Sequence, residues 1–305
     1  MTRPARVQRG AAIVLAMLLA AFAAVVAAAV LADQQRWTRN VEHRRNQVQA
    51  QATALAGVQW ARQILYDDAR SSVIDHLAEP WALRLPPIPL DNGEIRGAIA
   101  DAQSRLNINA LGDDAAVVER TRLARLFAQR AGPSAALAAI ADWIDRDGTP
   151  REGGGEDAWY RAQATPTMPP NAPLLRVAEI ATVRKVTYPA LAAIQPYVTA
   201  LPLRTSVNVN TAPAEVLAAV LDDAPREAIE AIIAGRAQKP FTTIPEFRAR
   251  LPNGASLASE EMLDVKSSHF EITVEVHQGE SVARARALVR RDAGQWPVVV
   301  WQVVE

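Results

Sequence analysis

Acidic residues are concentrated in one short segment near the middle of the chain. Within residues 142–157, six acids stand against two arginines, which leaves a formal charge of −4; the acids are Asp142, Asp145, Asp147, Glu152, Glu156 and Asp157. Calcium takes about six to eight oxygen ligands, often carboxylates and backbone carbonyls of flexible loops. The triplet Gly153-Gly154-Gly155 lets backbone carbonyls turn inward. The segment is therefore a candidate calcium site, and the alternative is a solvated acidic loop.

The spacing of these acids rejects an EF-hand. Counted from Asp145, Glu156 stands at the twelfth loop position, where that motif has its glutamate. Thr149 and Arg151 stand at the fifth and seventh positions, however, and Gly148 is at the fourth rather than the sixth. We therefore expect any calcium ion to be held by an irregular loop.

Other catalytic or metal chemistry finds no support in the sequence. The chain has no cysteine, which excludes a disulfide scaffold, a thiolate zinc site and a cysteine nucleophile. No Ser/His/Asp set or phosphate loop is visible, and the histidines are scattered without ligand spacing: His43, His76, His269 and His277. The 33 basic residues balance the 33 acidic ones, which argues against a general nucleic-acid binder. We expect no enzymatic activity.

The N-terminal region contains a candidate membrane span. Residues 11–32 are an unbroken apolar run, and about 20 residues of helix cross the hydrocarbon core of a bilayer. Arg3, Arg6 and Arg9 precede the run without a balancing acid, so the positive-inside rule places the N-terminus in the cytoplasm and exports the rest. The alternative is a cleaved secretory signal, because Val30-Leu31-Ala32 before Asp33 fits a small-residue cleavage site.

Helical periodicity continues beyond the apolar run. Val41, Val48, Ala52 and Leu55 recur at helical spacing, and no proline interrupts residues 11–65. The pattern predicts one helix from Ala11 to about Leu65. Its first half would lie in the bilayer, and the face from Val41 through Leu55 would pack against partners and against its own globular domain.

The remaining sequence mixes strands with helices. Alternating patterns predict strands over residues 93–100, 106–109, 270–276, 281–291 and 297–303, while residues 85–89 form a proline-punctuated connector. Helical patterns lie between the early and late strands, within residues 113–147, 177–183, 189–197, 225–234 and 245–251, and in a helix that Thr211 would cap. This order predicts an α+β fold, in which a long N-terminal helix packs on a small antiparallel sheet and a large α-helical domain is inserted.

A set of short motifs carries a family resemblance. The basic leader ending in Arg9-Gly10 resembles that of type IV pilins and pseudopilins. From about residue 70 to 305 the chain resembles the minor pseudopilin protein K family of type II secretion systems; the motifs are Glu79-Pro80-Trp81, residues 105–109, 141–145 and 155–160, and Asn208-Val209-Asn210-Thr211-Ala212-Pro213. Most pseudopilins carry glutamate at the fifth mature position, whereas this chain has Leu15, as protein K does.

The resemblance implies processing, a location and partners. Prepilin peptidase would cut between Gly10 and Ala11, and the new terminus would be methylated. The chain would span the bacterial inner membrane once, with its C-terminal domain in the periplasm. It would join minor pseudopilins I and J at the tip of the pseudopilus, beside other pseudopilins and the inner-membrane secretion platform, to initiate or cap assembly for export of folded proteins. Neither catalysis nor nucleic-acid binding is implied.

The resemblance also implies calcium binding and a pilin-like domain plan. The expected calcium ligands are Asp145, Asp147, Glu156 and Asp157, and the ion would order a long loop that has no disulfide. The predicted plan is a leader (1–10), a transmembrane segment (11–32), an amphipathic helix with the first part of the pilin-like domain (33–110), the inserted helical domain (111–265) and the strands that complete the sheet (266–305).

One rival hypothesis comes from the segment between Asn208 and Phe247. It resembles helix-hairpin-helix modules, in which a small loop and a helix N-terminus hold a DNA phosphate. This chain would then be a membrane-anchored periplasmic protein of the DNA-uptake kind. Those modules have glycine in the hairpin, whereas Leu221-Asp222-Asp223-Ala224-Pro225 has two acids and no glycine. Because like charge repels phosphate, we favour a packing role for this segment.

Overall fold

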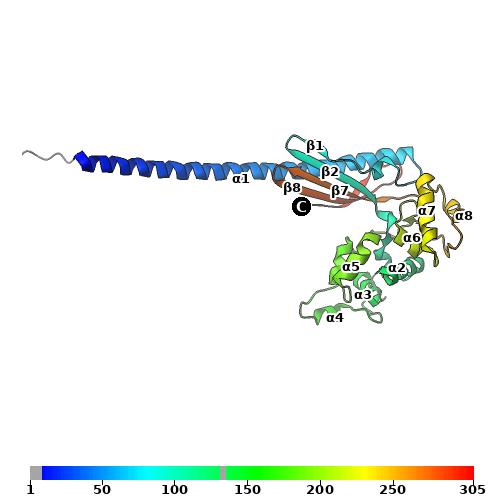
Figure 1. Ribbon diagram of the computed structural model, residues 1–305. Helices are drawn as coiled ribbons and strands as arrows, with labels where there is room; N and C mark the ends of the chain where they lie inside the picture. The colour runs from blue at the N-terminus through cyan, green and yellow to red at the C-terminus, as the bar shows by residue number, and fades with distance from the viewer. Residues whose placement is uncertain (1–8, 131–134) are drawn as a thin grey trace, which may run out of the picture.

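The computed structural model describes the backbone of residues 9–130 and 135–305 and the side chains of residues 11–130 and 136–305. Residues 1–8 of the predicted leader, Arg3 and Arg6 included, lie outside the described residues. The first element is one continuous helix, α1 (Arg9–Ser71), which confirms the predicted long helix. Figure 1 shows that its first half stands clear of the rest of the molecule and that its second half lies along the sheet.

Within the free half of α1, residues 11–32 are apolar around the whole circumference. Leu15, Leu18 and Phe22 are all exposed, and the most hydrophobic window of the helix has a mean hydropathy of 2.9 with no residue buried in the protein. A helix that is hydrophobic on every side needs an apolar environment. By length and composition this segment is therefore a candidate membrane span.

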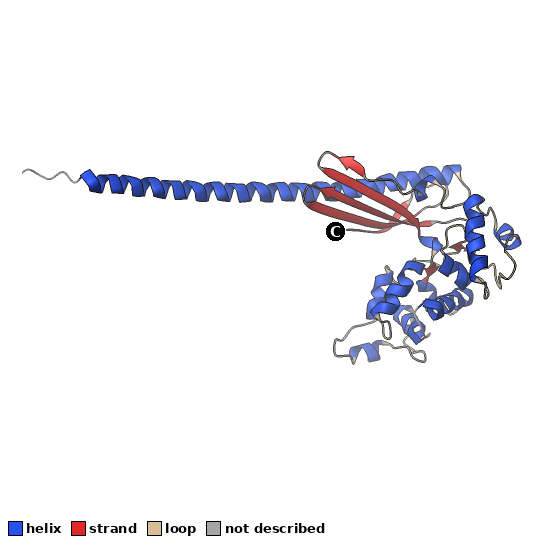
Figure 2. Ribbon diagram, in the orientation of Figure 1, coloured by secondary structure: helices blue, strands red, loops and turns tan. Residues whose placement is uncertain are grey.

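The second half of α1 packs on an antiparallel sheet. The sheet contains β1 (Ile88–Leu90), β2 (Gly93–Asp101), β7 (His269–Gln278), β8 (Ser281–Arg290) and β9 (Val298–Val304), in the order β1-β2-β7-β8-β9 (Figure 2). Strict alternation in the late strands buries one face, because successive side chains of a strand point to opposite sides. Phe270, Ile272 and Val274 of β7 and Ala285 of β8 belong to the core between α1 and the sheet.

The helix face that meets the sheet consists mainly of small residues. Ala50, Ala54, Val58 and Ala61 are buried there, and a Cβ atom added at Gly57 would lie 2.8 Å from Cγ1 of Val274. Such a face allows the helix backbone to approach the strands closely.

The predicted packing face of α1 is therefore wrong for the contact with its own domain. Val41, Val48 and Leu55 are exposed by 46%, 66% and 37%, and Ala52 is exposed as well. The alternative face supplies close packing because its alanines and glycine leave room for the strands. The spacing of the large aliphatic residues alone pointed to the opposite side of the helix.

The connector predicted at residues 85–89 contains a strand. Residues Ile88–Leu90 form β1 and pair antiparallel with the first part of β2, with Ile88 opposite Ile95. Proline is tolerated on an edge strand because the side that faces away from the sheet needs no N–H donor. Pro89 therefore does not prevent the short strand.

A helical part is inserted between β2 and β7. Its helices are α2 (Val117–Arg130), α3 (Ala135–Ile144), α4 (Asp157–Arg161), α5 (Tyr188–Ile194), α6 (Ala214–Val220), α7 (Arg226–Gln238) and α8 (Ile244–Ala249). Two short parallel pairs tie it together: β3 (Leu106–Asn107) with β4 (Val198–Thr199), and β5 (Val207–Asn208) with β6 (Leu263–Asp264). It has its own core, which includes Phe127, Ile140 and Leu217. The predicted α+β arrangement is confirmed.

Short 3-10 helices mark the connections of both parts. They are η1 (Pro80–Ala82), η2 (Ala102–Ser104), η3 (Ile108–Gly112), η4 (Val177–Thr182) and η5 (Gln195–Tyr197).

One predicted cap is wrong: α6 begins after Pro213, and the hydroxyl of Thr211 instead donates a hydrogen bond to Oδ2 of Asp101 at 2.6 Å. Thr211 thereby links the helical part to the end of β2 rather than capping a helix.

Candidate metal centre

The acidic segment is folded around Asp142, which lies near the end of α3 and is fully buried. Its Oδ2 accepts the backbone N–H of Arg151 at 3.1 Å and that of Gly155 at 2.9 Å. A Cβ atom at Gly154 would lie only 1.9 Å from the same oxygen, so glycine is needed at this approach. One carboxylate therefore fixes the path of the loop that leads to Glu156.

Three buried carboxylates converge in this loop. One oxygen from each of Asp142, Asp145 and Glu156 lies within 4.8 Å of the others, and all three residues are more than nine-tenths buried. Calcium binds oxygen ligands at about 2.3–2.6 Å, so oxygens on opposite sides of an ion stand roughly this far apart. The group has the dimensions of a calcium site.

Several carboxylate oxygens in this group and in the adjacent Asp157 lack hydrogen-bond partners. Within the described part of the chain, Oδ1 of Asp145, both oxygens of Glu156 and Oδ1 of Asp157 are buried with no partner. A buried charge without compensation is unfavourable. These oxygens therefore fit a cation, which would supply the missing positive charge.

One arginine neutralises part of the negative charge of the group. Arg151 donates to Oδ1 of Asp142 at 2.9 Å, pairs with Asp145 and reaches Asp114 at 3.1 Å. No basic side chain among the described residues pairs with Glu156 in this way. Burial, followed by the charges of Asp145 and Asp142, raises the pKa of Glu156 to about 7, and burial also raises the pKa of Asp145.

The predicted ligands divide into two groups in the structure. Asp145 and Glu156 are brought together. Asp147 is exposed and accepts the N–H of Thr149 at 2.8 Å, and Oδ2 of Asp157 pairs with Arg161 at 2.9 Å. An open cleft of about 530 Å³ borders Asp145, Asp147 and Arg151, which gives solvent access beside the group.

Asp142 is the residue missing from the predicted ligand set. It precedes Asp145 by three residues. Asp145 directly follows α3 and still donates its N–H to the carbonyl of Ala141, so helical spacing places both carboxylates on one face. That spacing is visible in the sequence. The contact of Asp142 with Gly155, thirteen residues later, is not, because it depends on how the loop closes.

The predicted processing site lies at the start of α1. The helix begins at Arg9, so Gly10 and Ala11 are in its first turn, and the side chain of Ala11 is exposed. The peptide bond between them is thus next to the membrane-span candidate.

The connection between α6 and α7 is occupied by contacts within the chain. The N–H of Asp222 donates to the carbonyl of Ser256 at 3.0 Å, and its carboxylate pairs with Arg125 at 2.7 Å. These contacts and the charge of Asp223 leave a poor surface for phosphate. The structure gives the helix-hairpin-helix hypothesis no support.

Comparisons with known proteins agree with this architecture. Two family models, each described as type II secretion system protein K, match residues 104–203 and 207–266. The type II secretion system protein K of Klebsiella pneumoniae is 31% identical over 310 residues, covering 96% of this chain and 95% of the relative. That of Pseudomonas aeruginosa is 30% identical over 289 residues, covering 90% and 86%.

The fold is also that of a solved structure. The crystal structure of the GspK-GspI-GspJ complex from the enterotoxigenic Escherichia coli type 2 secretion system contains a chain that matches with a TM-score of 0.74 and 23% identity. The match covers 90% of this chain and 99% of the other. By its family models and its relatives, the chain belongs to the type II secretion system protein K family.

Proposed function

We propose that this chain is the minor pseudopilin at the tip of the type II secretion pseudopilus. The observation that carries the proposal is the single helix α1, whose exposed apolar half continues directly into a half that packs on an antiparallel sheet. This combination suits a subunit that is stored in the membrane and then moves into a helical filament core. The family of the chain places it in type II secretion.

Two features favour the tip position. Helices α7 and α8 of the helical part reach past the end of α1 that lies away from the membrane-span candidate, where a further subunit would have to stack (Figure 1). Leu15 replaces the carboxylate that would otherwise engage the terminal amine of a neighbouring subunit. A subunit that starts the filament has no subunit above it, so it does not need that carboxylate.

The partners follow from the same position. A related K protein is solved as a complex with GspI and GspJ. We infer that this chain binds its own minor pseudopilins I and J and, through them, joins the other pseudopilins and the inner-membrane platform. The complex would initiate or cap assembly for the export of folded proteins.

The membrane topology follows from the charges around residues 11–32. Three arginines precede the segment, so the N-terminus stays in the cytoplasm and the sheet and helical part lie in the periplasm. Prepilin peptidase would cut on the cytoplasmic side between Gly10 and Ala11. The mature chain would then begin with a methylated Ala11.

Calcium would have a structural role at the loop centre. Asp145 and Glu156, with Asp142 beside them, offer buried carboxylate oxygens, and the loop from Ile144 to Tyr160 contains little secondary structure. An ion would tie the end of α3 to the start of α4. Such a cross-link suits a chain that has no cysteine.

N-terminal sequencing and co-purification test the proposal. The full-length gene is expressed together with prepilin peptidase and tagged proteins I and J from the same secretion system, and the membrane fraction is solubilised. We expect a complex of all three proteins in which this chain begins at Ala11, while a Gly10→Leu variant stays uncleaved. A mature terminus at Asp33, or a cleaved chain that does not bind I and J, would contradict the proposal.

A further inference from the structure

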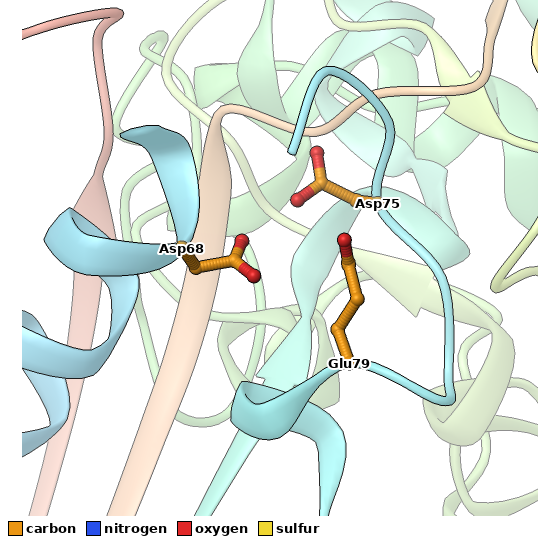
Figure 3. A group of neighbouring side chains, drawn as sticks. All are labelled: Asp68, Asp75 and Glu79. Carbon is orange, nitrogen blue, oxygen red and sulfur yellow. The ribbon is translucent and has the colours of Figure 1, made fainter. Parts of the chain in front are cut away.

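A second group of acidic side chains lies where α1 ends. Asp68 is in the last turns of α1, and Asp75 and Glu79 are in the loop that leads to η1. Figure 3 shows the three side chains pointing toward one another. One oxygen from each lies within 4.8 Å of the others, and the three residues are only 6%, 1% and 5% exposed.

One buried arginine serves two of these carboxylates. Arg291, which follows β8, donates to Oδ2 of Asp68 at 2.7 Å and also pairs with Oδ1 of Asp75. The N–H of Ser267 donates to the other oxygen of Asp75 at 2.7 Å. The arginine therefore supplies one positive charge against three negative charges, which leaves −2 in a buried space.

Glu79 is the carboxylate that the arginine does not reach. Its Oε2 accepts the N–H of His76 and the indole N–H of Trp81, both at 2.8 Å, and these bonds hold the side chain in place. Its Oε1 is buried and has no hydrogen-bond partner among the residues that the structure describes. The nearest basic atom, Nε2 of His76, is 3.9 Å away, which is too far for a hydrogen bond.

The same arrangement occurs in the acidic loop. There Arg151 pairs with Asp142 and Asp145, and Glu156 has no partner in the described part of the chain. Here Arg291 pairs with Asp68 and Asp75, and Oε1 of Glu79 has none within the same described residues. In both groups three acids face one arginine, and one divalent cation would balance the remaining charge.

We propose that Asp68, Asp75 and Glu79 form a second divalent-cation site, suited to calcium, at the junction of α1, the sheet and the helical part. All the donors are carboxylate oxygens, which hard cations such as calcium prefer, and Nδ1 of His76 already accepts the N–H of Ala78 at 3.2 Å. Calcium also tolerates an irregular ligand shell completed by water. The inference does not depend on the tip function.

The charge of the group supports an ion rather than an empty space. Three buried carboxylates share one arginine, and Oε1 of Glu79 has no partner among the described residues. A bound cation would supply the missing positive charge and would join Asp68 at the end of α1 to Asp75 and Glu79 in the loop before η1.

The first test counts calcium ions on the full chain in detergent micelles. The protein carries Glu156→Gln to weaken the loop centre, is stripped with chelator and is then titrated with calcium. We expect one ion to remain bound, and we expect Asp68→Asn to lower its affinity at least tenfold. The matched control is Asp67→Asn, because Asp67 is the preceding residue but is exposed and should leave the affinity unchanged.

A second measurement tests where the ion binds. Terbium replaces calcium, and its emission is excited through tryptophan. Because the Trp81 indole donates to Glu79, we expect Trp81→Phe in the Glu156→Gln chain to reduce the emission severalfold while terbium still binds. Glu79→Gln should remove both binding and emission.

Two results would overturn the proposal. One is a Glu156→Gln chain that binds neither calcium nor terbium, which would mean that protons balance the junction. The other is equal calcium affinity in the Asp68→Asn and Asp67→Asn chains together with emission that Trp81→Phe does not change. The terbium measurement needs no change in the three acids, so it decides the question even where an acid variant does not fold.

Discussion

The carboxylate of Asp142 accepts the backbone N–H of Gly155, thirteen positions later, at 2.9 Å and thereby closes a loop at the edge of the helical part. The same oxygen also accepts the N–H of Arg151. This oxygen fixes the loop whether or not an ion is bound. The buried carboxylate of Asp142 thus holds the loop backbone in place, and that backbone positions Glu156 for the proposed ion.

Removing the Asp142 carboxylate should destabilise the chain strongly. Asp142→Ala leaves two backbone donors and part of the Arg151 charge without partners, which costs about 3–5 kcal/mol when a buried pair is broken. Urea unfolding followed by tryptophan fluorescence measures the loss. Asp147→Ala is the control and should change the free energy of unfolding by less than about 0.5 kcal/mol, because Asp147 is exposed. Equal losses in the two variants would contradict this role of Asp142.

Glycine at position 154 should be required by its contact with Asp142. A Cβ atom there would lie 1.9 Å from Oδ2 of Asp142 and 3.2 Å from the carbonyl of Ala138, so Gly154→Ala must shift the loop. We expect a loss of about 1–3 kcal/mol, as for other overpacked sites. Gly148→Ala is a matched control because nothing lies within 4 Å of its added Cβ atom. A thermal scan that shows no difference between the two variants would rule out the close approach.

The stability of the calcium-free chain should fall between about pH 4.5 and pH 7. The pKa of Glu156 is raised from 4.5 to about 7, so the folded chain holds this proton more tightly than the unfolded chain does. The resulting stability is complete below pH 4.5 and is lost as the pH rises through 7, and it amounts to at most about 3 kcal/mol. Urea unfolding in chelator at several pH values measures it. The free energy of unfolding should fall less steeply with pH in Glu156→Gln. An equally steep fall in this variant would show that other groups cause the pH dependence.

Chelation should lower the melting temperature of the chain near neutral pH. Calcium requires ionised carboxylates, so it stabilises the protein in the same pH range in which the free Glu156 charge destabilises it. The melting temperature should rise with calcium concentration, as for any ligand that binds the folded state. The rise should be smaller in Glu156→Gln and unchanged in Glu230→Gln, whose carboxylate is exposed on α7. Identical melting with and without excess chelator would exclude a structural ion.

The small-residue face of α1 should tolerate larger side chains poorly. In Gly57→Leu the added Cβ would lie 2.8 Å from Val274 and 3.2 Å from Ile95, which should separate the helix from the sheet and cost about 1–3 kcal/mol. Val48→Ala is the comparison on the opposite face, where the side chain is exposed, and should change the stability of the isolated chain by less than about 0.5 kcal/mol. The free energy of unfolding in urea separates the two. A larger loss of unfolding free energy for Val48→Ala would instead support the packing face predicted from the sequence.

Elements whose signals come from neighbouring residues could be predicted from the sequence. The apolar run at residues 11–32 and the absence of proline predicted the long helix α1, and the strict alternation in residues 270–276 predicted β7. The acids of residues 142–157 also pointed to the loop in which Asp142, Asp145 and Glu156 converge. Periodicity and local composition are properties of consecutive residues, so they are readable without the fold.

Which side chains meet depends on the tertiary fold. Alternation and spacing could not show that the alanines and Gly57 of α1, rather than Val41 and Val48, face the sheet, because the choice depends on how closely the strands approach. The contact of Asp142 with Gly155 depends on loop closure. Arg291 meets Asp68 across 223 positions of sequence, because the sheet returns the end of β8 to the end of α1. The topology brings together charged residues that are far apart in the sequence, and no local sequence pattern shows that they share a buried space.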